Sequence, residues 1–227
     1  MEKEQKQVND SHAAPENTSG AEVFVCRFPG VVSGAGKSIR QLKQAFYDLL
    51  EEHEAVLAVR VDEAAGTALI TAFPEGEYDP AACVFLIRPS RVRNGNVFIL
   101  AGGKEDLPAA LEARYALAAC GAESTMVITR GAAEPGSLAE LQGRLSCAAA
   151  CIAVAGKDNT LPGIAAALTQ SPVIALPVTV CGASPLESVM SLAGILARKG
   201  TGLTMVSTDD GLGAGFAAAR IINSSVK

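Results

Sequence analysis

From Asn96 to the C-terminus, short apolar runs alternate with longer stretches that have the apolar spacing of helices. This alternation is typical of βαβ units, in which each helix returns the chain to the start of a parallel strand. The predicted helices begin near Asp106, Ser137, Leu161 and Pro185, and a last one begins after Gly213. The predicted strands are Val97–Leu100, Met126–Thr129, Cys151–Ala155, Val173–Leu176 and Leu203–Ser207.

Residues 21–93 show the same pattern on a smaller scale. An amphipathic helix is predicted at Ile39–His53, and Pro89–Gly95 is polar enough to be a linker. The predicted strands of this unit are Val23–Cys26, Val56–Val61 and Cys83–Ile87.

The expected fold class is therefore α/β, with two domains after a tail. Residues 1–20 are predicted to be a disordered tail, 21–93 a small N-terminal α/β domain and 94–227 the larger domain. The larger domain is expected to be a right-handed, doubly wound parallel sheet of flavodoxin-like, three-layer α/β/α type.

Three positions have the residues that commonly begin helices. Asp106 lies two residues before Pro108, Ser184 directly precedes Pro185, and Asn159 lies ahead of Pro162. A side-chain oxygen at the cap accepts a backbone N–H, and a proline in the first turn lacks only an N–H that would have no helical partner. Asp106 is thus predicted to cap its helix.

The composition excludes several classes of partner. A formal net charge of −5 argues against nucleic acid and against anionic membrane surfaces, because both select basic proteins. No apolar run approaches the roughly 20 residues that a membrane helix requires. The polar first twenty residues do not have the pattern of a secretory signal, so we expect a cytoplasmic protein whose six cysteines are free thiols.

Glycine-containing loops follow most of the predicted strands of the larger domain. Ligands of open parallel sheets bind at the carboxyl ends of the strands, where glycine lets the backbone approach an anion and helix N-termini supply N–H donors. A phosphorylated small molecule or nucleotide is the predicted ligand. The candidate ligand-binding residues are Gly102, Gly103, Asp106, Gly156, Asn159, Pro177, Ser184, Gly211 and Gly213, with Lys37 reaching an anion across the domain interface.

The segment from Gly34 to Ser38 resembles the end of a P-loop, but the spacing fails. A P-loop requires glycine five positions before Gly36, and that position is Val31. We interpret the segment as a glycine turn that leads into the Ile39 helix.

The usual catalytic sets are missing. His12 lies in the predicted tail and His53 closes a surface helix, which makes a catalytic triad or a histidine-ligated metal improbable. Asp158 could act as a base or hold a ribose hydroxyl, and helix capping is an equal alternative for it. Cys181 follows a strand and precedes a glycine, and its alternative role is that of a small buried hydrophobe.

Three stretches together resemble the phosphoribosylaminoimidazole carboxylase superfamily. They are VAGKDNTLPGIAAALTQSPVIALPVTVCGAS, CRFPGVVSGAGKSIRQ and STDDGLGAGFAAARII, and they span residues 26–222. They are most similar to the enzymes that make the pyridinium biscarboxylate mononucleotide of the nickel-pincer cofactor.

This resemblance implies a specific chemistry. Such enzymes bind nicotinic acid adenine dinucleotide, carboxylate its pyridinium ring with CO2 or bicarbonate as co-substrate, and release AMP. An enzyme thiolate first adds to the cationic ring, which makes the ring electron-rich. No resident cofactor is indicated, and Mg2+ is the metal considered. The resemblance also implies symmetric oligomers, so we expect a homo-oligomer or a hetero-oligomer with a related enzyme.

The chain departs from this family at the reacting positions. Lys199 stands where the family has its nucleophilic cysteine, Gly136 falls where its histidine is expected, and Glu105 replaces a phosphate-binding serine. If catalysis persists, Lys199 is the candidate to stabilise a carboxylate, Asp158 to move a proton and Cys181 to replace the thiol.

Three hypotheses follow from these matches and departures. The first is a divergent family member that binds a nucleotide, with or without carboxylase and hydrolase activity. The second is a non-catalytic paralogue, a pseudoenzyme, that serves as a subunit beside a genuine family enzyme. The third is an unrelated flavodoxin-like module, which would carry a bound chromophore.

Overall fold

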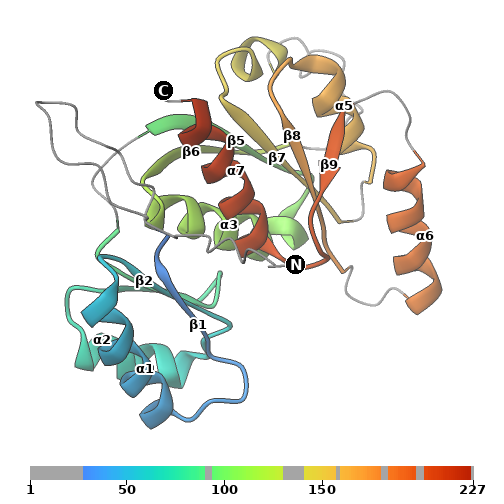
Figure 1. Ribbon diagram of the computed structural model, residues 1–227. Coiled ribbons are helices and arrows are strands. Elements are labelled where there is room, and N and C mark those ends of the chain that lie inside the picture. The colour runs from blue at the N-terminus through green and yellow to red at the C-terminus, as the bar shows by residue number, and fades with distance from the viewer. Residues whose placement is uncertain are drawn as a thin grey trace, which may run out of the picture.

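The computed structural model describes residues 28–89, 94–129, 141–156, 159–179, 184–197 and 202–225. It confirms the predicted fold class. A five-stranded parallel sheet with helices on both faces forms the larger domain, and a smaller α/β domain precedes it (Figure 1). The predicted strand Val23–Cys26 lies outside the described residues.

The larger sheet has the strand order β6-β5-β7-β8-β9, and all of its neighbouring strands are parallel. β6 follows β5 in the chain and pairs with one side of it, and the next strand, β7, pairs with the other side of β5. The point between β5 and β7 is therefore the topological switch point of the sheet. The strands are β5 (Asn94–Ala101), β6 (Ala122–Ile128), β7 (Ala150–Ala155), β8 (Val173–Pro177) and β9 (Leu203–Met205).

Alternate residues of the strands face two different helical layers. Ile99 and Ile152 lie in a buried cluster with α3 and α7, whereas Phe98 and Ala153 lie in a cluster with α5 and the helical segment 141–145. The helices are η1 (a 3-10 turn, Lys104–Asp106), α3 (Leu107–Ala119), α5 (Leu161–Leu168), α6 (Pro185–Leu196) and α7 (Gly211–Ser225).

The small domain is a four-stranded mixed sheet of order β1-β2-β4-β3, with β4 antiparallel to both neighbours. The predicted smaller α/β domain is thus confirmed, and its sheet is mixed, in contrast to the parallel sheet of the larger domain. Phe46, Leu69 and Phe85 lie in the core between this sheet and its two helices. The elements are β1 (Gly30–Ser33), β2 (Val56–Val59), β3 (Glu77–Asp79), β4 (Val84–Ile87), α1 (Ile39–Glu52) and α2 (Glu63–Ala72).

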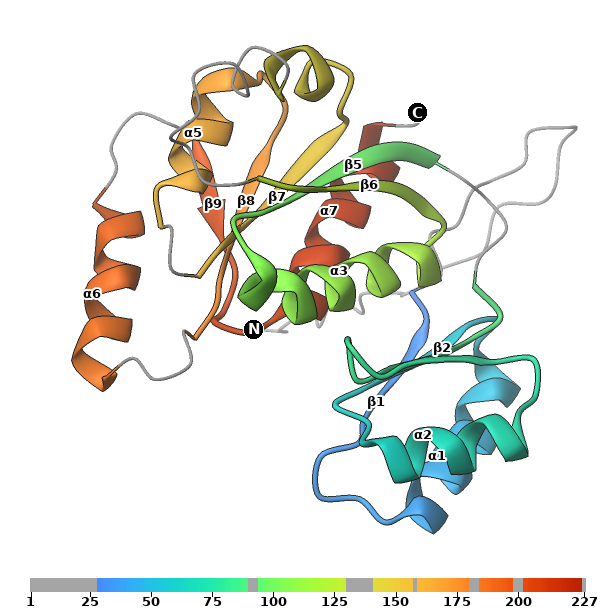
Figure 2. The ribbon, with the colours of Figure 1, turned by 180° about the vertical axis from the view of Figure 1, so that it is seen from behind.

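The other face of the small sheet packs on α3 and α7 of the larger domain. Leu57 and Leu86 share a buried cluster with Ala116 and Ala119 of α3. These two helices thus lie between the two sheets, as Figure 2 shows for α3. A helix that contacts a sheet on each side needs small side chains, and this explains the alanines of α3. At Gly215 of α7 an added Cβ would lie 2.6 Å from the Cβ of Ala116, so the two helices pack in close contact.

Several predicted boundaries differ from the structure for local reasons. The strand predicted to end at Val61 ends at Val59, because Arg60 adopts a left-handed conformation with φ of 57°. The strand predicted from Met126 begins at Ala122, the strand predicted to reach Ser207 ends at Met205, and the last helix begins at Gly211 rather than after Gly213. The elements β1, α2 and β3 were not predicted.

The predicted helix starts have mixed outcomes. Ser184 caps α6 as expected, and its hydroxyl accepts the Glu187 N–H at 3.3 Å in a capping box. Asp106 precedes α3, and Pro108 lies in the first turn, but the Asp106 side chain makes no capping hydrogen bond to the helix. The predicted glycine turn before α1 is confirmed: Gly36 has φ of 72°, and Ser38 caps the helix.

Candidate functional site

The loops after β5 and β7 meet at the switch point, around the carboxylate of Asp106. Asp106 is 3% exposed and is the one buried charged side chain among the described residues. Its Oδ2 accepts the backbone N–H of Gly102 at 2.8 Å. The carboxylate that was predicted to cap α3 therefore closes its own loop instead, and this bond fixes the path of the chain between β5 and α3.

Gly156, directly after β7, completes this contact. A Cβ added to Gly156 would overlap Oδ1 of Asp106, so the glycine backbone lies against the carboxylate. Any side chain at residue 156 would push the two loops apart. The structure therefore brings together three predicted site residues, namely Gly102, Asp106 and Gly156.

The loops after β8 and β9 are joined by a second carboxylate. Oδ1 of Asp209 accepts the Thr179 N–H at 2.8 Å, and Oδ2 accepts the Thr179 hydroxyl at 2.6 Å. The N–H of Asp209 in turn donates to the carbonyl of Pro177 at 2.9 Å. Asp209 has φ of 57°, a conformation in which asparagine and aspartate are more common than most residues. Thr179 was not predicted to be a site residue. The one feature of the sequence that pointed to it is its place two residues after a strand.

The N-terminus of α7 is capped by carboxylates from two elements. Asp210 Oδ1 accepts the Gly213 N–H at 2.8 Å, and Glu112 of α3 accepts the Leu212 N–H at 2.8 Å. An added Cβ at Gly211 would lie 2.5 Å from the Ala109 carbonyl oxygen, which shows how tightly this turn packs on α3. Gly211 and Gly213 thus let α7 start against α3, and the Leu212 and Gly213 N–H groups already have partners within the protein.

Glu112 has an unusual electrostatic environment. Burial raises the pKa of its carboxyl above the ordinary 4.5, although the Leu212 N–H and the charge of Arg60 act in the opposite direction. Asp210 and Asp209 add to the rise through like-charge repulsion. Sequence reasoning had no signal for Glu112, because its partner is 100 residues away in the chain.

The remaining predicted residues are distributed over other parts of the structure. Asn159 lies against α6, since an added Cβ at Gly194 would be 3.0 Å from its Nδ2. Lys37 lies in an exposed turn of the small domain, and its N–H donates to the Gly34 carbonyl at 3.1 Å. The three candidate reacting residues, Lys199, Asp158 and Cys181, lie outside the described residues.

Cys151 of β7 is a buried thiol with a raised pKa. Burial raises its pKa to about 12, so the thiolate is scarcely populated at neutral pH. Its Sγ lies in the core between β7 and α5, and this cysteine is a packing residue.

The described part of the chain has neither a clustered metal site nor a helix that could span a membrane. It contains no group of three or more His, Cys, Asp or Glu side chains arranged to hold a metal ion. Among its helices, none has the length and apolarity needed to cross a bilayer.

Comparisons with known proteins place this architecture among its relatives. A family model described as AIR carboxylase matches residues 96–227, and one described as LarB/PurE-like N-terminal domain matches residues 26–89. An uncharacterized protein of Methanocaldococcus jannaschii is 28% identical over 203 residues, which are 85% of this chain and 78% of that protein.

Among solved structures, a diflavin flavoprotein A3 from Nostoc sp. is similar over 60% of this chain and 94% of its own. The identity is 13% and the TM-score 0.34, which is too low to support any argument about function.

Proposed function

Because this chain belongs to the AIR carboxylase family, we propose that it binds a nucleotide at the carboxyl edge of its larger sheet. The site is centred on the switch point between β5 and β7. The ligand class is nicotinic acid adenine dinucleotide, its mononucleotide or a purine ribotide, as the motif resemblance implies.

The contact between Asp106 and Gly156 carries this proposal. Ligands of doubly wound sheets bind in the crevice where the strand order reverses, and here a buried carboxylate fixes the two loops that form that crevice. Asp106 acts as a positioning residue, since both of its oxygens face loop backbone. The ligand would lie against the exposed side of these loops, where glycine leaves the backbone accessible.

Thermal unfolding with and without ligand tests the proposal. A nucleotide at about 100 times its dissociation constant adds about 2.7 kcal/mol to the stability of the folded protein and raises its melting temperature. Adenosine, which lacks the phosphate, is the matched control and is expected to produce a smaller rise. If no nucleotide in the panel changes the melting temperature at millimolar concentration, the nucleotide assignment is wrong.

A second function, assembly, is favoured by the outer face of α6. Leu186, Val189, Met190 and Leu196 are between 61% and 70% exposed, whereas Ile195 on the opposite side of the helix is buried. In both ribbon views α6 stands at the margin of the molecule, beyond the strand edge at β9 (Figures 1 and 2). A helix that is apolar on its outer as well as its inner face is expected to be covered.

We propose that a second copy of this chain covers α6. The stripe at residues 186, 189, 193 and 196 is symmetric about residue 191, so an antiparallel pair places Leu186 opposite Leu196 and Val189 opposite Ala193. The two large leucines then face each other at the ends of the helix pair, and the small Ala193 faces Val189 near its centre. Antiparallel pairing also sets the positive N-terminus of each helix beside the negative C-terminus of the other.

Sedimentation analysis of two variants tests this pairing. The parent chain is expected to be at least a dimer, and Leu186→Glu is expected to dissociate it. Ile70→Glu, at an exposed apolar residue of α2, is the matched control and leaves the mass unchanged. A parent chain that is monomeric at every concentration, or a Leu186→Glu variant with unchanged mass, overturns assembly through α6.

A further inference from the structure

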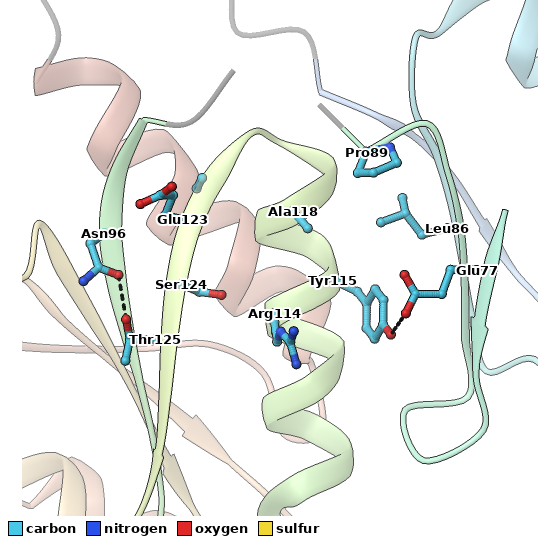
Figure 3. Close-up of a pocket in the computed structure, with 11 residues that line it drawn as sticks. Glu77, Leu86, Pro89, Asn96, Arg114, Tyr115, Ala118, Glu123, Ser124 and Thr125 are labelled. Carbon is cyan, nitrogen blue, oxygen red and sulfur yellow. Dashed lines mark hydrogen bonds between the residues drawn. The ribbon is translucent and has the colours of Figure 1, made fainter. Parts of the chain in front are cut away.

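The larger sheet has an open edge at β6. In the strand order β6-β5-β7-β8-β9, this strand pairs with β5 on one side and has no strand on the other side among the described elements. α3 packs against one face of β6. A hydrogen bond from the Thr125 hydroxyl to Oδ1 of Asn96, at 3.2 Å, also joins β6 to β5 (Figure 3). The inner side of β6 is therefore firmly held, and its outer side can accept another strand.

Alternate backbone groups of β6 point away from the sheet. The Thr129 N–H, directly after the strand, donates to the Ala101 carbonyl of β5 at 2.8 Å. Because the N–H and C=O groups of successive strand residues point to alternate sides, those of Thr125 and Val127 also face β5. The residues whose N–H and C=O groups face outward are the ones between them and beside them, namely Ser124, Met126 and Ile128.

A cavity of about 400 Å³ borders the first half of this edge (Figure 3). Its lining includes both Glu123 and Ser124, which are consecutive residues, so their side chains face opposite sides of the sheet. A space that reaches both sides of a strand must pass around the edge of that strand. Within the described part of the chain, the outward groups near Ser124 therefore border open space.

The other sheet edges of the described chain are protected. Native proteins keep edge strands short or charged, because the unpaired groups of a long, uncharged edge bind other strands. The edge strands β3 and β9 have three residues each, two of them acidic in β3, and β1 has four. β6 has seven residues with one charge among them, and Ile128 at its end is 49% exposed. The edge at β6 is thus the one suited to pairing.

We propose that β6 pairs with β6 of a second copy of this chain, so that the two larger sheets become one continuous sheet. A two-fold axis perpendicular to the sheet makes the two strands antiparallel, and each strand then presents the same surface to the other. Overlap of all seven residues places this axis at Thr125, the central residue of the strand. Ser124 then lies opposite the partner's Met126, and Ala122 lies opposite the partner's Ile128.

The strand is complementary to itself in this register. The residues whose backbone groups face outward lie opposite one another, so each of these pairs can exchange a pair of hydrogen bonds. A shift by one residue would set outward groups against groups that already face β5. Glu123 lies opposite the partner's Val127, so the one charge of each strand does not meet its own copy. A second copy therefore satisfies the edge without a buried charge pair.

This contact is distinct from the one proposed at α6. α6 stands beyond β9, at the opposite margin of the sheet from β6 (Figures 1 and 2). Two different two-fold contacts on one chain assemble more than two copies, and each contact can be removed separately.

Sedimentation analysis of a proline variant tests the pairing on the whole chain. Ser124→Pro removes an N–H that points away from β5, and its ring blocks an approaching strand, whereas the pairing with β5 is retained. The variant is expected to lower the mass of the parent assembly at least about twofold. Val31→Pro in the edge strand β1 is the matched control and leaves the mass unchanged. The Gly30 N–H donates to the Ala55 carbonyl at 2.9 Å, so the Val31 N–H also points outward.

Leu186→Glu separates this contact from the one at α6. In that background the remaining assembly is the β6 pair, and the addition of Ser124→Pro is expected to give the monomer. If Leu186→Glu leaves the mass unchanged, the α6 contact is wrong and the effect of Ser124→Pro still stands. If Ser124→Pro leaves the mass unchanged in both backgrounds, the β6 pairing is wrong.

Hydrogen exchange in the parent chain, measured residue by residue, tests the same contact without a substitution. The Val127 amide faces β5 and is expected to exchange slowly at every protein concentration. The Met126 amide is expected to exchange at least about tenfold faster once dilution separates the copies. Rapid exchange of Met126 at all concentrations would show a free edge. Slow exchange in the monomer would show that another segment of the same chain covers β6, and either result overturns the proposal.

Discussion

The backbone of Gly156 lies directly against the carboxylate of Asp106, and this contact joins the loops that leave β7 and β5. Asp106 belongs to the loop after β5, where its carboxylate accepts the Gly102 N–H at 2.8 Å. The relationship explains why the smallest residue stands at position 156: the space that a Cβ would need is already filled by an oxygen of a buried carboxylate.

Gly156→Ala is therefore expected to destabilise the protein by about 1–3 kcal/mol, since the methyl group must displace a buried carboxylate. Gly143→Ala is the matched control, because an added Cβ there has no atom within 4 Å. In the control, alanine is expected to be neutral or to stabilise its helix by up to about 1 kcal/mol. Chemical denaturation of both variants measures the difference, and equal stabilities would show that the two loops are not in contact.

The pattern of apolar residues was sufficient to predict the larger sheet but not its loops. β7, β8 and the Val97–Ala101 part of β5 are continuous apolar runs buried on both faces, and such runs are visible in a sequence. The short strands β1 and β3 lack this signal: β3 is Glu77–Asp79, with two acidic residues of three. β2 ends earlier than predicted because Arg60 adopts a left-handed backbone conformation, which the conformational preferences of arginine do not predict.

The parallel sheet brings the predicted loops to one edge, whereas the contacts within these loops were not predicted. The glycine residues after the strands marked the carboxyl edge. The partners of the site carboxylates, however, depend on tertiary packing, as the bond from Leu212 to Glu112 and the bond from Thr179 to Asp209 show. Helix capping predicted a local partner for Asp106, whereas the structure gives this side chain the Gly102 N–H because the loop folds back on it.

Glu112→Gln is expected to stabilise the protein at neutral pH. Burial and the charges of Asp209 and Asp210 raise the pKa of Glu112 in the folded state, so its ionised form is less favourable there than in the unfolded chain. Below the ordinary pKa of 4.5 the carboxyl is protonated, and its raised folded-state pKa contributes to the stability of the folded protein. This contribution is lost as the pH rises through the folded-state pKa. Glutamine keeps an acceptor for the Leu212 N–H and removes the charge.

The measurement is the melting temperature of Glu112→Gln and of the parent at pH 7 and at a pH below 4.5. The variant is expected to melt higher than the parent at pH 7, and the gain should decrease at the lower pH, where the parent carboxyl is protonated. Glu51→Gln, on the exposed side of α1, controls for the loss of a surface charge. A loss of stability at pH 7 would mean that the charged hydrogen bond outweighs burial.

Cys151 is expected to resist alkylation in the folded protein. Its thiol is buried and has a pKa raised to about 12, so both access and thiolate formation are suppressed. Cys147 is exposed and serves as the internal control. Brief treatment with iodoacetamide at pH 8, followed by mass spectrometry of peptides, should label Cys147 first and Cys151 only after denaturation. Equal labelling of the two in the folded protein would contradict the core position of Cys151.

The final prediction concerns carboxylation itself. Addition to a pyridinium ring requires a nucleophile that is deprotonated near pH 7, and a thiolate meets this requirement far better than an unperturbed lysine amine. With a reference pKa of about 10.4, all but roughly one part in a thousand of a lysine is protonated at that pH. Since Lys199 stands where the resemblance places the nucleophilic cysteine, we expect little or no carboxylation of nicotinic acid adenine dinucleotide.

Incubation of the protein with nicotinic acid adenine dinucleotide, bicarbonate and magnesium, followed by mass spectrometry for the added carboxyl group and for AMP, tests this expectation. Turnover that is abolished by Lys199→Ala and retained by Cys181→Ala would overturn it and make lysine the nucleophile. Turnover that is lost only in Cys181→Ala would show that the thiol acts from another loop of the same edge. Binding without turnover is the expected result, because the loops that hold a nucleotide and the group that attacks its ring are separate requirements. By the motif resemblance, the glycine loops match the family, whereas Lys199 takes the place of its attacking thiol.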